Sequence, residues 1–153
     1  MNKPIVQEKK QLDPKEYNQI LRGVKLTDIR LINCSAAANK ENPKEMAAEF
    51  ELQEMRFSIQ NKNSTVYADL RFQAKEESED EPVVTINARF SLSFNSDEEL
   101  TSEFMEIFTK VTVPITIWPY CRELVANILP RMGFPPAPAP LLINLPKGKK
   151  SPQ

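Results

Sequence analysis

The feature that most restricts the fold is a strict two-residue alternation of apolar and polar side chains late in the chain. Within the expected strand of residues 82–95, every second residue from Val84 onward is apolar and the residues between them are polar. Successive side chains of a β-strand point to opposite faces of a sheet, so this pattern predicts a strand with one buried face and one solvated face. Such half-buried strands are typical of antiparallel sheets. The apolar set is Val84, Ile86, Ala88, Phe90, Leu92 and Phe94.

Two further segments predict strands of the same sheet. Residues 64–75 alternate in the same way, with the apolar side chains on the even numbers. An earlier strand-like segment begins at Tyr17 and changes phase at Thr27-Asp28, which indicates a β-bulge or a sharp twist. The acidic run at residues 76–81 is interpreted as a solvated hairpin loop, because it lacks the ligand spacing of a calcium loop.

A fourth strand is expected over residues 45–60, and its apolar phase changes halfway. One continuous strand of this kind would present apolar groups to both faces of the sheet. We therefore expect more apolar surface than one core can bury. This surplus would be covered by oligomerisation or would bind a partner, and the alternative is that the chain buries it in a larger core of its own. The even-numbered set is Met46, Ala48, Phe50 and Leu52, and the odd-numbered set is Met55, Phe57 and Ile59.

Helical periodicity follows the last strand. Ser96 and Glu99 have the spacing of a capping box, and apolar residues such as Phe104, Phe108 and Val111 then recur at helical intervals. Pro114 is expected to end this helix, and a second helix is expected over residues 115–132 with a glycine cap at position 133. The prediction is an α+β fold, in which a four-stranded antiparallel meander is followed by two helices packed on one face.

The chain of 153 residues fits one domain. We expect a polar arm over residues 1–16, a single domain over residues 17–145, and a basic tail over residues 146–153. Six of the thirteen prolines lie between positions 130 and 146, which predicts a stiff, extended segment. The first residues contain no apolar stretch of the signal-peptide type, so a cytoplasmic location is expected.

Composition excludes several functional classes. Histidine is absent, which removes Ser-His-Asp and Cys-His catalysis and the commonest zinc ligand. The 20 basic and 21 acidic residues nearly balance, which argues against nucleic-acid binding, and no apolar run reaches the roughly 18 residues of a membrane span. Cys34 and Cys121 are expected to be buried free thiols. We predict no enzyme, no cofactor, no metal site and no membrane insertion.

Residues 114–125 read PITIWPYCRELV, and this segment resembles the signature helix of the SecB chaperone family, which reads approximately Pro-Asn-Ile-Leu-Phe-Pro-Tyr-Ala-Arg-Glu. The continuation RMGFPP at residues 131–136 is similar to the family's Arg-Gly-x-Phe-Pro loop, and the apolar residues 140–144 resemble the apolar segment after that loop. The resemblance covers roughly residues 17–145. It implies a sheet of four antiparallel strands with helices, assembled as a homotetramer that is a dimer of dimers.

The resemblance also implies a function. Members of the family hold unfolded clients in long apolar grooves without ATP. The clients are preproteins in the members that deliver to the translocase ATPase SecA, or an antitoxin in members that belong to a toxin–antitoxin pair. Two other functions use the same apolar surplus: a small carrier or enzyme with a closed acyl-chain pocket, and a purely structural assembly subunit.

Candidate site residues fall into two groups. The client-binding candidates are Phe50, Leu52, Met55, Phe57, Ile59, Leu141, Leu142 and Ile143. The second group carries the family motif and is expected to hold the fold together: Pro119, Tyr120, Arg122, Glu123, Phe134 and Pro135. The pair Arg122-Glu123 is interpreted as a structural or surface ion pair, the alternative being a catalytic acid with its partner.

Overall fold

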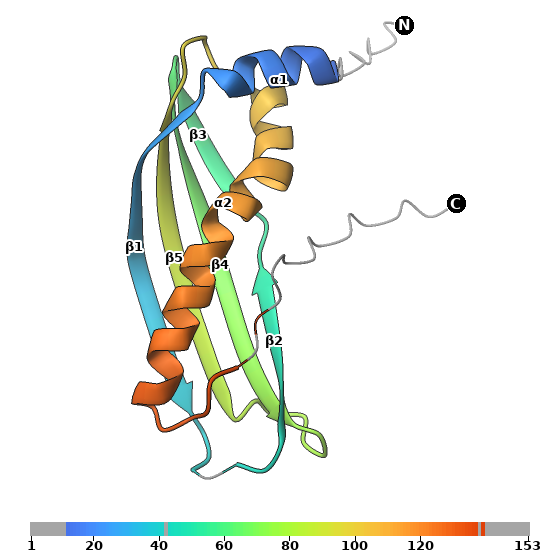
Figure 1. Cartoon of the computed structure of the whole chain (residues 1–153), viewed down its shortest axis with the longest axis vertical. Helices are drawn as coiled ribbons and strands as arrows, with labels where there is room; N and C mark the ends of the chain where they lie inside the picture. The colour runs from blue at the N-terminus through green and yellow to red at the C-terminus, as the bar shows by residue number, and fades with distance from the viewer. Residues whose placement is uncertain (1–11, 42, 138, 140–153) are drawn as a thin grey trace, which may run out of the picture.

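The two strands with the strictest alternation form the centre of the sheet. The computed structural model describes residues 12–41, 43–137 and 139, and in it β4 (Asn63–Glu76) pairs antiparallel with β5 (Val84–Asn95). Every even-numbered residue of β4 from Ser64 to Glu76 and of β5 from Val84 to Phe94 is buried, whereas the odd-numbered residues are half-buried or exposed. The buried face lies under the long helix α2 (Ser102–Arg131), so the alternation is confirmed as the origin of the core (Figure 1).

The order of the strands is not the expected meander. The remaining strands are β1 (Lys25–Ala38), β2 (Met46–Leu52) and β3 (Arg56–Gln60). In the described part of the chain the sheet has five strands in the order β1-β5-β4-β2, with β3 also paired to β4. The chain therefore passes from β1 across the end of the sheet to β2 (Figure 1), as in a Greek key. Alternation specifies which face of a strand is buried but not which strand lies beside it, so the meander was wrong while the antiparallel α+β class is confirmed.

The expected fourth strand is two strands, and the break between them removes the surplus apolar face. Leu52 pairs with Leu70, and Phe57 pairs with Val66, so both lie on the face that α2 covers. The three residues between β2 and β3 correct the phase, and the backbone N–H of Gln53 still donates to the carbonyl of Asp69 at 2.9 Å. The prediction of a strand that presents apolar groups to both faces was wrong.

The first helix lies where a strand-like segment was expected. α1 (Pro14–Arg22) begins after Asp13, whose carboxylate accepts a hydrogen bond from the backbone N–H of Lys15. An Asp-Pro pair is a strong helix start, because the aspartate caps the free N–H groups and proline fits the first turn. Tyr17 is buried from this helix: its ring stacks on Phe104, and its hydroxyl shares a hydrogen bond of 2.7 Å with the Thr112 hydroxyl of α2.

A single helix follows the sheet instead of two. α2 starts at the N-cap Thr101, whose hydroxyl accepts from the N–H of Phe104, whereas Ser96 only forms a local contact with the N–H of Glu98. The helix then continues through Pro114 and Pro119. The expected start and the expected break were therefore wrong.

The prolines are tolerated because of where their missing hydrogen bonds fall. A proline at position i leaves the carbonyl of residue i−4 without its helical donor. For Pro114, Pro119 and Pro130 these carbonyls belong to residues 110, 115 and 126, which are all exposed and open to water. The opposite side of α2 gains the core contacts of the largest fully buried side chain, Trp118. Apolar packing therefore outweighs three local defects.

The connection between β1 and β2 is held to the end of the sheet by Glu76. This carboxylate is 5% exposed and accepts from the ammonium of Lys40 at 3.0 Å and from the backbone N–H of Lys44 at 2.9 Å. The backbone N–H of Asn39 also donates to the carbonyl of Val83 at 2.7 Å. The hydrogen bond from Lys40, and then that from Lys44, hold the pKa of Glu76 below its ordinary value of 4.5.

A carboxylate with a lowered pKa in the folded state stabilises the fold above its unfolded pKa, and this stability is lost as the pH falls through the folded pKa. We expect Glu76→Gln to flatten the decrease in melting temperature between about pH 6 and pH 3 relative to the unmodified chain. Circular dichroism melts across this range measure the effect. Parallel curves for the two proteins would show that Glu76 does not contribute to acid sensitivity.

Candidate functional site

Four of the expected client-binding residues form one apolar row along an edge of the sheet. Phe50, Met55, Phe57 and Ile59 are all half-buried and pack against the core from the edge strands β2 and β3 and, for Met55, from the connection between them. We call these four residues the apolar edge row. Because no strand lies beyond β2 and β3 in the described chain, their side chains are covered from only one side.

α2 supplies the inner wall of this row. The ring of Phe50 meets the indole of Trp118 edge-on, with 5.3 Å between ring centroids, and it meets Phe72 of β4 at 4.8 Å. Edge-to-face contacts of this kind fix the orientation of the rings. These contacts fix the position of Phe50 within the row.

The other expected client-binding residues are not part of the apolar edge row. Leu52 is only 3% exposed and belongs to the core, because it sits opposite the buried Leu70. Leu141, Leu142 and Ile143 lie outside the described residues.

The family motif is mostly on the outer side of α2. Pro119, Tyr120 and Glu123 are exposed, and Arg122 is half-buried. The Nε of Arg122 is shielded from water and has no hydrogen-bond partner in the described chain. A buried polar atom without a partner is costly, so the position of Arg122 is held by the packing around it.

Phe134 is buried by the turn that ends α2. The N–H of Phe134 donates to the carbonyl of Leu129 at 2.9 Å, and the N–H of Gly133 donates to that of Pro130 at 3.1 Å. These two bonds form a Schellman motif, for which Gly133 adopts a φ of 81°. The glycine cap is confirmed, and the turn directs the chain back toward β2 (Figure 1). Pro135 beyond it is exposed.

Sequence reasoning missed an apolar stripe on the outer face of α2. Ile115 is 60% exposed and Val111 is 49% exposed, although Val111 was expected on the core side. Tyr120 is also exposed, at 42%, further along the same helix. The sequence did indicate this stripe, because the helical segment is apolar around most of its circumference. Helices of that kind are typically covered on more than one side.

β1 is a second uncovered surface. It is an edge strand of 14 residues, and nearly all of its residues are exposed because α2 does not reach over it. Residues 31–38 carry no charge, and charges are the usual protection of a free edge. Cys34 lies in this stretch and is exposed, so the expectation that it is buried was wrong.

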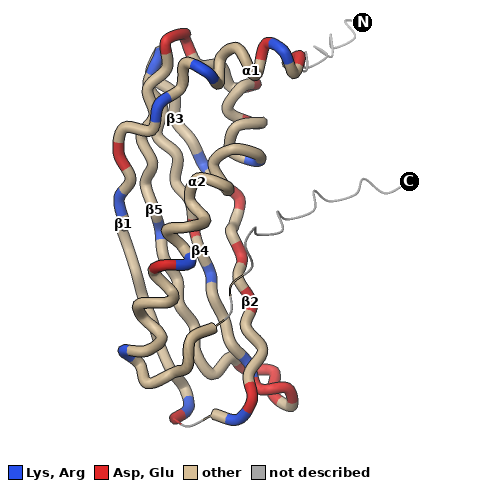
Figure 2. Tube along the Cα trace, viewed as in Figure 1, with Lys and Arg blue, Asp and Glu red and all other residues tan. Residues whose placement is uncertain are grey.

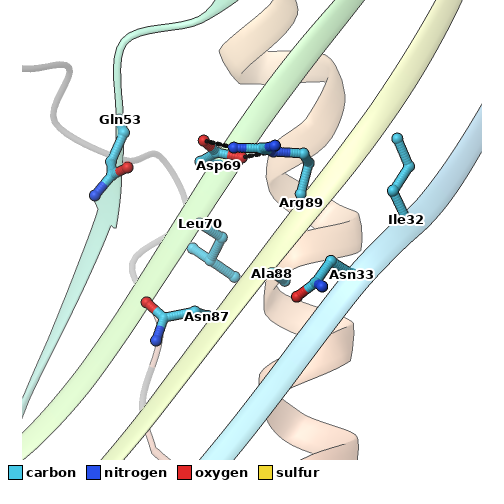
Figure 3. Close-up of a pocket in the computed structure, with 8 residues that line it drawn as sticks. All are labelled: Ile32, Asn33, Gln53, Asp69, Leu70, Asn87, Ala88 and Arg89. Carbon is cyan, nitrogen blue, oxygen red and sulfur yellow. Dashed lines mark hydrogen bonds and ion pairs between the residues drawn. The ribbon is translucent and has the colours of Figure 1, made fainter.

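The face of the sheet opposite α2 is polar and shallowly hollowed. Figure 3 shows the hollow around Asp69, Arg89, Asn33 and Asn87, with the ion pair at its centre. The guanidinium of Arg89 donates to both carboxylate oxygens of Asp69, at 2.7 and 3.0 Å. This contact lowers the pKa of Asp69, so the carboxylate remains ionised.

Two observations concern metal binding and thiol chemistry. The described residues contain no group of three or more histidine, cysteine or acidic residues that could hold a metal ion. Burial raises the pKa of Cys121 to about 12, so its thiol remains protonated and unreactive. Among the described residues, none of the helices has both the length and the apolar character to cross a membrane.

With this geometry in place, the fold can be compared with known proteins. It matches the structure of the Mycobacterium tuberculosis SecB-like chaperone Rv1957 in complex with a ChAD peptide from the antitoxin HigA1 (Rv1956), with a TM-score of 0.71 and 18% sequence identity. The match covers 81% of this chain and 94% of that chain. No family model matches the sequence, and no curated protein is similar to it.

At this level of identity the match shows the fold. The chain therefore has the fold of a SecB-like chaperone, as the motif in α2 implied.

The two thiols differ in a way that can be measured. We expect Cys34 to react with a thiol reagent in the native protein, because its side chain is exposed, and Cys121 to react only after denaturation. The Cys34→Ala variant in its folded state should then show no reactive thiol. Labelling of Cys121 at a rate similar to that of Cys34 would contradict the buried position of α2 on the sheet.

Proposed function

We propose that this chain is an ATP-independent molecular chaperone that holds unfolded polypeptides in the cytoplasm and has no catalytic activity. The observation that carries the proposal is the apolar edge row, which leaves Phe50, Met55, Phe57 and Ile59 half-covered on a SecB-like fold. A folded protein normally covers such a row, and an unfolded client offers apolar side chains that can do so.

The binding energy of such a row comes from the hydrophobic effect and not from the formation of covalent bonds. Each Å² of apolar surface removed from water contributes about 25 cal/mol, so a few side chains give only weak binding. Several weak contacts along one flexible client add through effective concentration. The client is thereby kept from aggregating, and selectivity follows from how long a client remains unfolded. Residues 141–143 are proposed to extend the row.

The client is proposed to be an antitoxin or another polypeptide that folds slowly. The structural neighbour was solved with a peptide from an antitoxin, which supports a peptide client for this fold. Delivery of preproteins to SecA is the second form of the proposal, and it rests on the resemblance in α2 alone.

We propose a homotetramer built as a dimer of dimers. A closed assembly of this kind needs two different self-complementary interfaces on each chain. The chain has two uncovered surfaces that suit them: the edge of β1, and the outer stripe of α2 with Val111 and Ile115. The motif residues Pro119, Tyr120 and Glu123 are exposed on the same helix and Arg122 is half-buried beside them, and these residues are proposed to help hold the assembly together.

The closed acyl-chain pocket has no supporting observation. Such a pocket would lie between α2 and the sheet, but that space contains side chains that are at most 2% exposed, among them Phe72, Phe108 and Trp118. The hollow around Asp69 and Arg89 lies on the opposite face of the sheet.

A pair of neighbouring substitutions tests the apolar edge row. Phe57 faces α2 and Ser58 faces the opposite side of the same strand. We expect Phe57→Glu to abolish capture of a chemically unfolded, slowly refolding client, because it places a charge in the row, and Ser58→Glu to preserve it. Capture is measured by light scattering during refolding, at a temperature at which both variants retain the circular dichroism spectrum of the unmodified chain. Equal capture by the two variants would refute the site.

The assembly is tested on the outer stripe. We expect the unmodified chain to have a mass near four chains by size-exclusion with light scattering, and Ile115→Glu to reduce it to about two, because a charge cannot be buried there without a partner. Lys15→Glu on α1 is the control and should leave the mass unchanged. A monomeric unmodified chain would overturn the tetramer, and an unchanged mass of Ile115→Glu would exclude this stripe as an interface.

A further inference from the structure

The face of the sheet opposite α2, here called the open face, collects arginine. Of the seven arginines in the sequence, four lie on this face, whereas the lysines are mostly elsewhere. Arginine differs from lysine in having a planar fork of donors that matches a carboxylate. The four arginines of the open face are Arg30, Arg56, Arg71 and Arg89.

The strand register brings these arginines close together. They fall in three successive cross-strand rows, and successive rows on one face of a sheet are about 7 Å apart. The first and third rows cross the sheet from β1 to the edge formed by β2 and β3, and the middle row runs from β1 to β4. The rows are Arg30, Ser91, Tyr67 and Arg56; then Asn33, Arg89 and Asp69; then Ser35, Asn87, Arg71 and Glu51.

Two of the four arginines are available to a ligand. Arg89 is held by Asp69, and Arg30 is paired with Asp28. Arg56 and Arg71 are exposed, and neither forms an ion pair with any residue that the structure describes. Arg56 pairs with Tyr67, two residues before Asp69 on β4, and its charge contributes to the lowered pKa of the Asp69 carboxyl.

Apolar side chains lie among these charges. Tyr67 is 37% exposed between Arg56 and Ser91, and Ile32 at the β1 irregularity is 53% exposed and lines the hollow (Figure 3). Tyrosine and arginine are among the residues most enriched at the energetic centres of protein interfaces. Small neighbours such as Ser91 leave the tyrosine ring accessible.

We propose that the open face is a docking surface for an acidic peptide segment of a protein partner. Arg56 and Arg71 bind its carboxylates, and Tyr67 with Ile32 contacts an apolar side chain between them. The charge pattern favours this partner: Arg56 and Arg71 are two free cationic groups on a face where the acidic Asp69 is held by Arg89, and Glu51 on the edge strand β2 is the one acidic residue paired in register with Arg71.

A polypeptide fits this surface better than a nucleic acid does. The hollow offers acceptors as well as donors, since the ionised Asp69 lies beside the amides of Asn33 and Asn87. A peptide backbone supplies both N–H donors and carbonyl acceptors, whereas a phosphate backbone supplies acceptors only.

This surface is separate from the proposed client site. The apolar edge row faces α2, and the arginines face the other side of the same sheet, so an acidic partner and an unfolded client can be bound at once. Figure 2 shows that the acidic residues of the β4–β5 loop gather at one end of the molecule, away from the hollow at the centre of the sheet. The chain's own acidic loop therefore leaves the open face free.

The test uses a fluorescein-labelled acidic peptide of alternating glutamate and glycine with one central leucine, and a counterpart with glutamine in place of glutamate. We expect anisotropy to show binding of the acidic peptide that weakens from about 50 to 300 mM salt, and no comparable binding of the counterpart. Arg56→Gln with Arg71→Gln should weaken binding by about tenfold or more. The control, Arg22→Gln with Lys62→Gln, removes the same charge elsewhere and should bind as the unmodified chain does.

Three outcomes would overturn the proposal: no preference for the acidic peptide, equal binding by the two double variants, or tighter binding of a single-stranded oligonucleotide that is lost in Arg56→Gln/Arg71→Gln. Capture of an unfolded client by the same variant should be unchanged. A loss of peptide binding with intact capture, or the reverse, therefore distinguishes this surface from the proposed chaperone function.

Discussion

The burial of one face of β4 and β5 under α2 is the interaction on which the rest of the structure depends. The even-numbered side chains of both strands are removed from water, and the helix contributes Phe104, Phe108 and Trp118 to the same layer. Because this helix is a single cylinder, it covers the two central strands and leaves the edges less protected. The exposed β1 and the half-buried row on β2 and β3 are direct consequences. In a SecB-like chaperone fold, the surfaces that are open to partners are therefore those that one helix is too narrow to cover.

The two faces of the sheet have different chemistry for the same reason. Strand alternation places apolar residues toward α2 and polar residues on the other side, so apolar contacts and charged contacts are separated by the thickness of one sheet. The proposed client row uses the first kind of contact, and the proposed acidic-peptide surface uses the second. Apolar binding tolerates many client sequences, whereas arginine forks select carboxylates. One sheet can thus present an unselective site and a selective site without interference.

α2 shows how packing overrides local preference. Three prolines lie within 30 helical residues, yet the helix is continuous, because the carbonyls they leave free are at exposed positions. The same outward side carries Ile115 and the half-buried Arg122, whose Nε has no partner in the described chain. Both features are unfavourable for an isolated chain. The proposed assembly would cover Ile115, and the exposed motif residues on this side would then contribute to the interface.

The sequence by itself determined the strands β4 and β5, their buried face, the α+β class, the glycine turn after α2 and, through the motif, the type of fold. These depend on local periodicity and on single residues, which are visible in a linear chain. Strand order, the break between β2 and β3, the continuity of α2 and the exposure of Cys34 were decided only by tertiary structure. Each depends on which segments become neighbours: alternation cannot say that β1 pairs with β5, and a phase change cannot show whether a strand turns its face or is interrupted. The clustering of Arg56, Arg71 and Arg89 has the same origin, since their positions in sequence are distant and only the register of the sheet brings them together.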